Sequence, residues 1–242
     1  MTGIVCPAAG TEADSANAAT GMINDFSKVC SSASGSAANV RYTKKVSFGK
    51  IRKKLKGQSS TTIMYTKNSS KESRLTCYGF YFNVWKIPHV GYGDEAETIT
   101  LYPVIKAKKK GSSSTLSLGI LFNSNVKVHS KTKRKYKKMT ISGGGQKFTI
   151  SGSTSTKRKH FGEFVGWKIF TKGTFTISSN SKVNLSRLEK LEKIMSSNNP
   201  TIKFKDSVKK KTYKCSIGSL GVKNMKSMIK KYKKLLKYYQ KK

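Results

Sequence analysis

The sequence predicts a mainly β protein, an antiparallel β-sandwich or open barrel with a short N-terminal helix and a C-terminal helix–strand–strand–helix segment. Three observations predict this class. Hydrophobic residues recur at every second position over much of residues 40–178, which is the period of a β-strand. Turn sequences such as the glycines of residues 143–145 separate these runs at hairpin intervals. On both sides of this region the hydrophobic spacing changes to three and four residues, the period of an amphipathic helix.

Residues 1–13 resemble the end of a secretory signal peptide, because a short apolar piece is followed by small residues, and we expect cleavage after Ala13. The charged part of such a peptide would precede Met1, which predicts that Met1 is an internal residue of a longer reading frame. If Met1 is instead the true start, the protein stays in the cytoplasm. Residues 14–39 are expected to form a helix over about 15–31, followed by a linker rich in Ser, Ala and Gly.

A β-sandwich-like region is expected over residues 40–180. Hydrophobic residues in each predicted strand alternate with Ser, Thr, Lys or Gly, so one face of the sheet would be apolar and the other hydrophilic. The Ser- and Thr-rich stretch 151–156 is expected to be a loop. The alternating positions are Val40 and Tyr42, Val46 and Phe48, Ile63 and Tyr65, residues 75–85, 99–105 and 116–122, Val126 and Val128, Met139 and Ile141, Phe148 and Ile150, residues 164–170, and Phe175 and Ile177.

Residues 181–242 are expected to form an α/β segment packed on the β region. Ser186 and Glu189 match a capping box at the start of a helix that ends near residues 198–200. A hairpin over residues 201–204 and 212–217 would follow, and then an amphipathic helix over about 222–239 with a lysine-rich face. Three interpretations of that helix stay open. In the first, the helix packs on the sheet and its lysines are solvated. In the second, it packs in the same way and its lysines also dock on a polyanion. In the third, it lies in a membrane surface.

Charge indicates the class of partner. The chain has 49 Lys and Arg against 11 Asp and Glu, a formal net charge of +38. This excess predicts contact with an anionic polymer or surface, although codon bias toward lysine is an alternative explanation. Arginine, which can read guanine or phosphate with a planar fork, is scarce, so sequence-specific nucleic-acid recognition is disfavoured.

Two dense basic clusters and the final helix supply the candidate binding residues. The first cluster is expected to lie in an exposed hairpin, and the second follows the loop expected over residues 151–156; the two are hypothesised to converge at one end of the sheet. Tyr136 would either stack on a sugar or base or face the core. The candidates are Lys131, Lys133, Arg134, Lys135, Tyr136, Lys137 and Lys138 in the first cluster, Lys157, Arg158 and Lys159 in the second, and Lys230, Lys233, Lys234 and Lys237 in the helix.

The sequence carries no motif for catalysis or for a bound metal or cofactor. The histidines His89, His129 and His160 are widely separated, and no metalloprotease or phosphate-loop motif occurs. Two cysteines, Cys77 and Cys215, fall in predicted strands and could form a disulfide, while free buried thiols are equally consistent with the pattern. We therefore expect a protein without catalytic residues, metal ligands or cofactors.

These observations predict a secreted or cell-envelope-associated, non-enzymatic protein that attaches to anionic polymers or surfaces through lysines. Its partner would be an anionic cell-wall polymer, an acidic glycan or an anionic membrane surface. No apolar run reaches the length of a transmembrane span. The leader, the Ser/Thr-rich strands and the lysine content are similar to exported proteins of low-GC Gram-positive bacteria. The alternative is an intracellular nucleic-acid-binding protein without strong sequence specificity.

Overall fold

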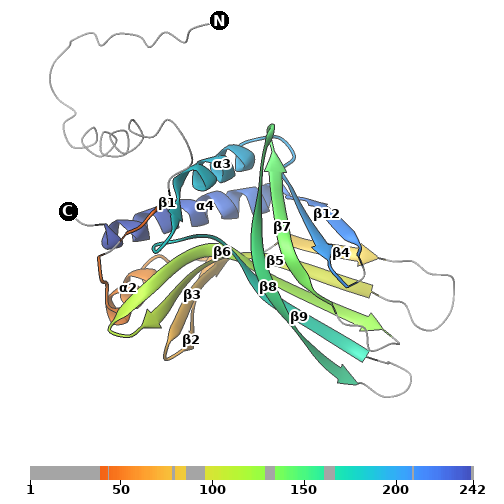
Figure 1. Ribbon diagram of the computed structural model, residues 1–242, viewed down its shortest axis with the longest axis horizontal. Coiled ribbons are helices and arrows are strands. Elements are labelled where there is room, and N and C mark those ends of the chain that lie inside the picture. The colour runs from red at the N-terminus through yellow and green to blue at the C-terminus, as the bar shows by residue number, and fades with distance from the viewer. Residues whose placement is uncertain are drawn as a thin grey trace, which may run out of the picture. The chain divides into compact units, whose positions relative to one another are not determined.

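The computed structural model describes residues 39–42, 44–77, 80–85, 96–128, 134–160, 167–208 and 210–240 (Figure 1). Strands dominate these ranges, and the mainly β class is confirmed, with a short helix before the sheet and a C-terminal helix–strand–strand–helix segment. The leader expected over residues 1–13 and the helix expected over about 15–31 lie outside the described residues. The strands are β1 (Asn39–Val40), β2 (Ile63–Ser69), β3 (Glu72–Cys77), β4 (Phe80–Trp85), β5 (Ala96–Lys110), β6 (Ser113–Val128), β7 (Tyr136–Gly143), β8 (Gln146–His160), β9 (Trp167–Ser179), β10 (Val183–Asn184), β11 (Thr201–Asp206) and β12 (Thr212–Ser216).

One antiparallel sheet contains ten of these strands. Its order is β12-β11-β7-β8-β9-β6-β5-β3-β2, and β4 pairs with the first half of β5, beyond the end of β3. The long neighbours β5 and β6 pair over almost their whole length and form the middle of the sheet. The pairing of β11 with β7 makes the C-terminal hairpin part of this sheet. The short strands β1 and β10 pair separately.

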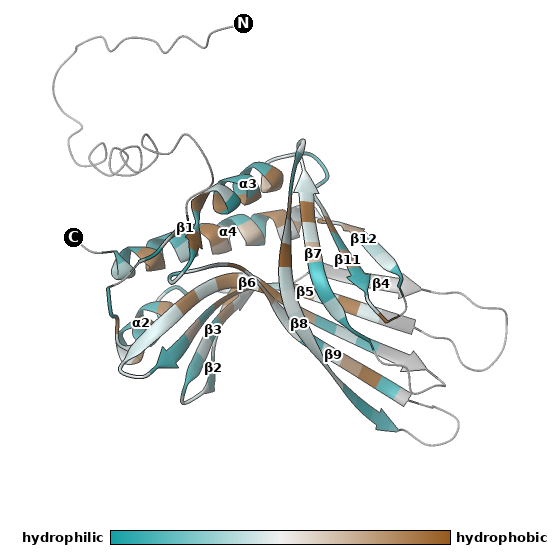
Figure 2. Ribbon diagram, in the orientation of Figure 1, coloured by the Kyte–Doolittle hydropathy of each residue, from teal (hydrophilic) through white to brown (hydrophobic). Residues whose placement is uncertain are grey.

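Helices cover one face of the sheet and create the core. Helix α4 (Ser219–Leu236) packs on β5 and β6, and α3 (Leu185–Met195) packs beside it on β7, β8 and β9 (Figure 1). A 3₁₀ turn, η1 (Lys237–Tyr239), continues α4. Hydrophobic and hydrophilic residues alternate along α4 in Figure 2, as expected of a helix with one buried side. Buried residues of α4 such as Met225, Ile229 and Tyr232 join the apolar face of the strands in one cluster.

A short helix replaces a strand expected near residue 48. Helix α2 (Phe48–Lys56) buries Phe48, Ile51 and Leu55, which lie three and four residues apart. The expected alternation rested on Val46 and Phe48 alone, two positions that fit a helix entry as well as a strand. The hydroxyl oxygen of Ser47 accepts a hydrogen bond from the Lys50 amide at 3.3 Å and caps the helix, so the local sequence favours the helix.

Helix α3, the β11–β12 hairpin and α4 lie where the sequence predicts them, but the cap of α3 differs. The side chain of Asn184 accepts the hydrogen bond of the Arg187 amide at 2.8 Å, whereas Ser186 was expected to cap the helix. The Ser186 hydroxyl donates instead to the same Asn184 oxygen. Asn184 therefore sets the start of α3 at Leu185.

The two cysteines of the described ranges, Cys77 and Cys215, are free thiols, so of the two alternatives left open by the sequence the structure has the free thiols and not the disulfide. Cys77 lies on β3 and Cys215 on β12, and six strands separate these two in the sheet order. Burial raises the pKa of Cys77 to about 12 and that of Cys215 to about 11. Both thiols are consequently protonated and unreactive at neutral pH.

Aromatic side chains from three parts of the sheet meet inside the fold. Phe122 of β6 lies 4.5 Å, between ring centroids, from Tyr136 of β7 and 5.6 Å from Phe204 of β11. Strands β6 and β11 are not neighbours in the sheet, so this contact requires the sheet to curl. Gly119 permits part of this curl, because a Cβ there would lie 2.6 Å from the carbonyl oxygen of Phe175 on β9.

We predict that Gly119→Ala lowers the free energy of unfolding by roughly 1–3 kcal/mol, because the added methyl group forces β6 and β9 apart. Gly49→Ala is the control, since no atom lies within 4 Å of the Cβ it would add and alanine favours the helix. Urea unfolding followed by circular dichroism measures both. Equal stabilities for the two variants would show that the close approach of β6 and β9 does not constrain the fold.

Candidate polyanion-binding surface

The first basic cluster lies on a crossover, whereas the sequence predicted a hairpin. Strand β6 pairs with β5 and β9, while β7 pairs with β8 and β11, so the chain between them joins strands that are not neighbours. Lys131 and Lys133 lie outside the described residues. Lys135, Lys137 and Lys138 are exposed, as expected for binding residues.

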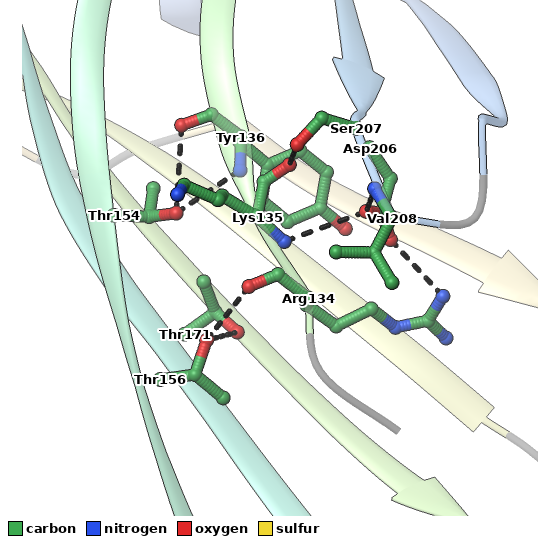
Figure 3. A network of polar contacts seen from close by, with 9 residues as sticks. All are labelled: Arg134, Lys135, Tyr136, Thr154, Thr156, Thr171, Asp206, Ser207 and Val208. Carbon is green, nitrogen blue, oxygen red and sulfur yellow. Dashed lines mark hydrogen bonds and ion pairs between the residues drawn. The ribbon is translucent and has the colours of Figure 1, made fainter.

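Arg134 and Tyr136 do not belong to the binding surface. The Arg134 side chain is 3% exposed, and its Nη1 donates to Oδ2 of Asp206 at 3.2 Å (Figure 3). Oδ1 of Asp206 accepts from the amides of Lys135 at 3.4 Å and Val208 at 2.9 Å, which fixes the carboxylate between β7 and β11. Tyr136 is fully buried in the aromatic cluster. The charge of Arg134 and the ring of Tyr136 are both used inside the fold, where they hold the start of β7 against β11 and the core.

The two basic clusters do lie beside each other. The hydroxyl of Thr156 donates to the carbonyl oxygen of Arg134 at 2.7 Å, and the Tyr136 amide donates to the hydroxyl oxygen of Thr154 at 3.0 Å (Figure 3). Residues 151–156 belong to β8, where they pair with β7 and β9, whereas a loop was expected. In this strand Lys157, Arg158 and Lys159 are all exposed. Lys157 and Lys159 point to one face of the sheet, and Arg158 points to the other.

A regular surface of lysines and hydroxyls covers the outer face of four neighbouring strands, β12, β11, β7 and β8. Pairing partners place the Lys214–Lys203–Thr140–Thr149 row next to the Ser216–Thr201–Ser142–Lys147 row. Side chains directly opposite each other point to the same face of a sheet. Their hydroxyls pair across strands, at 2.8 Å between Thr140 and Thr149 and at 2.9 Å between Ser142 and Thr201. We call this surface, over the part of β8 that pairs with β7, the strand face; its lysines are Lys137, Lys138, Lys147, Lys203, Lys205 and Lys214.

A β-bulge adds one more lysine to the strand face. Phe204 pairs with Met139 and Asp206 pairs with Tyr136, so Lys205 alone lies opposite both Lys137 and Lys138. The two residues of a bulge depart from the usual alternation of side chains. Both lysines are exposed, in agreement with this geometry. Three ammonium groups thus gather at the bulge between β7 and β11.

No acidic side chain offsets this charge on the described strand face. Among strands β7, β8, β11 and β12 the one acid is Asp206, which is fully buried against Arg134. Lys203 and Lys214 lie directly opposite each other, an arrangement of like charges that destabilises a sheet. An anion bound from solution would offset this repulsion, because it would lie close to both ammonium groups.

The final helix keeps most of its lysines in solvent. Exposed lysines lie on the side that faces away from the sheet; they are Lys223, Lys226, Lys230 and Lys234 of α4 and Lys237 of η1. Lys233 is an exception among the candidates, because its Nζ donates to both carboxylate oxygens of Glu192 on α3 at 2.8 Å. The apolar side of α4 packs on β5 and β6, as the first two interpretations require, and docking of its lysines on a polyanion stays a prediction. We call the five exposed lysines the helix face.

Sequence reasoning missed the lysines of β11 and β12. The alternation of buried Ile202 and Phe204 with Lys203 and Lys205 was available as a signal. The pairing of β11 with β7 was not, because it joins residues about 60 positions apart in the chain. The strand face consequently consists of Lys137 and Lys138, which were predicted, and of Lys147, Lys203, Lys205 and Lys214, which were not.

A second group of charges lies at the other end of the sheet, around a buried lysine. Lys106 of β5 is 9% exposed and its ammonium group contacts the hydroxyl of Thr174. Glu72 is bound by Arg74 Nε at 2.5 Å and by Lys108 at 3.3 Å. Burial and, to a smaller extent, the nearby charge of Arg74 together lower the pKa of Lys106 to about 8. The group is compact and internally paired, so it offers less free charge than the strand face.

The structure shows neither a membrane-crossing helix nor a metal-binding cluster within its described ranges. None of the described helices is both long enough and apolar enough to cross a bilayer. No group of three or more His, Cys, Asp or Glu side chains there is close enough to hold a metal ion. Comparison of the chain with protein-family models, with curated proteins and with solved structures gives no match.

We predict that Asp206→Asn lowers the free energy of unfolding by about 3–5 kcal/mol, because it leaves the Arg134 charge buried without its carboxylate. The double variant Arg134→Leu with Asp206→Leu is expected to lose much less, since it removes both charges together. Chemical unfolding at pH 7 measures this difference. An equal loss in the single and double variants would mean that the pair acts through packing and not through charge.

We predict that Lys106→Met makes the protein more stable than wild type at pH 7, by up to about 3 kcal/mol. Between pH 8 and 10.5 the unfolded chain binds more protons at this lysine than the native state, so wild type gains stability as pH rises through that window. The advantage of the variant should therefore shrink from pH 8 to 10. The exposed Lys110→Met is the control and should change stability by less than about 0.5 kcal/mol at each pH. A constant difference between wild type and the Lys106 variant would contradict the assigned titration.

Proposed function

We propose that this protein is a non-enzymatic binding protein that attaches to anionic polymers at the cell envelope, and that the strand face is its main contact. The observation that carries the proposal is the row pattern of exposed lysines and hydroxyls on four paired strands, without an acidic side chain among the described outward residues. Ammonium groups attract phosphate, sulfate or carboxylate groups, and hydroxyls donate hydrogen bonds to their oxygens.

The side chains of the strand face are better suited to the anionic backbone of a polymer than to the bases of a nucleic acid. Its outward positions on β7, β8, β11 and β12 hold no aromatic ring, while Tyr136, Phe204 and Tyr213 from this part of the chain face the interior. Stacking platforms for single-stranded nucleic acids require such rings on the surface. The face also lacks arginine forks for reading base edges. A polymer with regularly repeated anionic groups and no bases fits these properties best.

The location at the envelope rests on the leader expected over residues 1–13 and on the charge of the whole chain. An envelope rich in anionic polymer would retain a protein of net charge +38 by electrostatic attraction. Nucleic-acid binding inside the cell is the alternative outcome of the experiments below.

We predict that the protein binds long-chain polyphosphate and dextran sulfate, with affinities that fall linearly with salt on a logarithmic plot. The variant K138Q/K203Q/K205Q/K214Q should bind more weakly, and its salt dependence should be shallower by about 1 for each lysine that contacts an anionic group. Fluorescence anisotropy over a salt series, with duplex DNA as a third ligand, measures both quantities.

The matched control is K67Q/K71Q/K109Q/K110Q, which removes the same charge from exposed lysines near the end of β2, in the turn before β3 and at the end of β5. If the control weakens binding as much as the strand-face variant, attraction is spread over the whole surface and the assigned face is wrong. If only duplex DNA remains bound at high salt, the protein belongs to the nucleic-acid-binding class.

A further inference from the structure

We propose that the protein bridges two anionic polymer chains, one on the strand face and one on the helix face. The inference rests on the proposed function, because it assumes that exposed lysines bind such polymers. It goes further in assigning two binding surfaces to one folded unit.

The two faces point away from each other across the core. On α3, Ile194 lies against Gly143 of β7 and Arg187 stacks on Phe148 of β8, so Gly143 and Phe148 mark the sides of these two strands that face the helices. The strand-face lysines occupy the alternate positions and point to the opposite side. On α4, Met225, Met228 and Tyr232 face the core, and the helix-face lysines occupy the opposite side of the helix. A sheet and a helix of about 10 Å diameter therefore separate the two surfaces.

Each face alone has the charge that a polymer requires. The helix face carries Lys223, Lys226, Lys230, Lys234 and Lys237 at spacings of three and four residues, which aligns them along one side of α4. Helix α4 contains no acid, and the nearest carboxylate of α3 that the structure pairs with it, Glu192, is bound to Lys233. The charge of the helix face is thus left for an external anion, like that of the strand face.

A straight polymer chain cannot lie on both faces at once. The two surfaces approach each other at one corner, where a hollow of about 770 Å³ is lined by Ser216 at the end of β12 and by Lys223 and Lys226 at the start of α4. A single chain could contact both faces only by bending sharply through this corner. Two separate chains need no bend, and each chain then offsets the repulsion among the lysines of the face that it binds.

A sandwich assay tests the inference with long-chain polyphosphate as the probe. Polyphosphate is fixed to a surface and loaded with full-length protein to a set bound mass, and fluorescent polyphosphate is then added. Wild type should capture the fluorescent chain. The strand-face variant K138Q/K203Q/K205Q/K214Q and the helix-face variant K223Q/K226Q/K230Q/K234Q, loaded to the same mass, should each capture at least about tenfold less, because each keeps one binding surface.

The outcomes separate this inference from the proposed function. If wild type does not load on the surface at all, the proposed function fails. If wild type loads but captures no second chain, one chain occupies both faces through the corner and bridging is overturned while polymer binding stands. If a face variant bridges as well as wild type, the second surface is elsewhere or on a second copy, and the assignment is overturned. The control variant K67Q/K71Q/K109Q/K110Q should bridge like wild type, and circular dichroism confirms that each variant is folded.

Discussion

Burial of a single face of the sheet is the constraint on which the rest of this structure depends. Helix α3 covers one side of β7, β8 and β9, and α4 covers β5 and β6, so the positions beneath the helices are mostly apolar and the alternate positions of β11, β7 and β8 are mostly hydrophilic. The strict alternation in β11 and β8 follows from this, because a shift of one residue would bury the lysines and expose the core. The same constraint that fixes the register therefore also orders the lysines and hydroxyls into rows.

The distribution of the few acids decides which cations are left for a partner. Asp206 is used inside the fold for Arg134, Glu72 is used for Arg74 and Lys108, and Glu192 is used for Lys233. Each of these pairs joins elements or stabilises charge near the interior. None of these ion pairs of the described residues includes a lysine of the strand face or of the helix face. Composition alone gives the excess of positive charge, and the placement of the acids turns this excess into two cationic surfaces.

Local patterns predicted much of the fold and only part of the candidate site. Alternating residues predicted β5, β6 and the β11–β12 hairpin, and helical spacing predicted α3 and α4, because each pattern is contained within one element. Strand pairing depends on contacts between distant residues, so neither the crossover before β7 nor the pairing of β11 with β7 could be read from the chain. Arg134 was misassigned for the same reason. Its partner Asp206 is 72 residues away, and a charged residue in a basic cluster gives no sign that it is buried.

The repulsion built into the two faces links stability to binding. Lys203 and Lys214 face each other on neighbouring strands, and Lys205 faces Lys137 and Lys138 across the bulge, so the folded state brings like charges together that the unfolded chain keeps apart. An anion that binds only the folded state relieves this repulsion and stabilises the fold by an amount that grows with the logarithm of its concentration relative to its dissociation constant. Simple salt screens the same charges but cannot span several of them. A polymer whose anionic groups follow the rows of the sheet should therefore stabilise the protein more than the same concentration of monomeric phosphate or sulfate, since one chain contacts several lysines that monomeric ions must occupy separately.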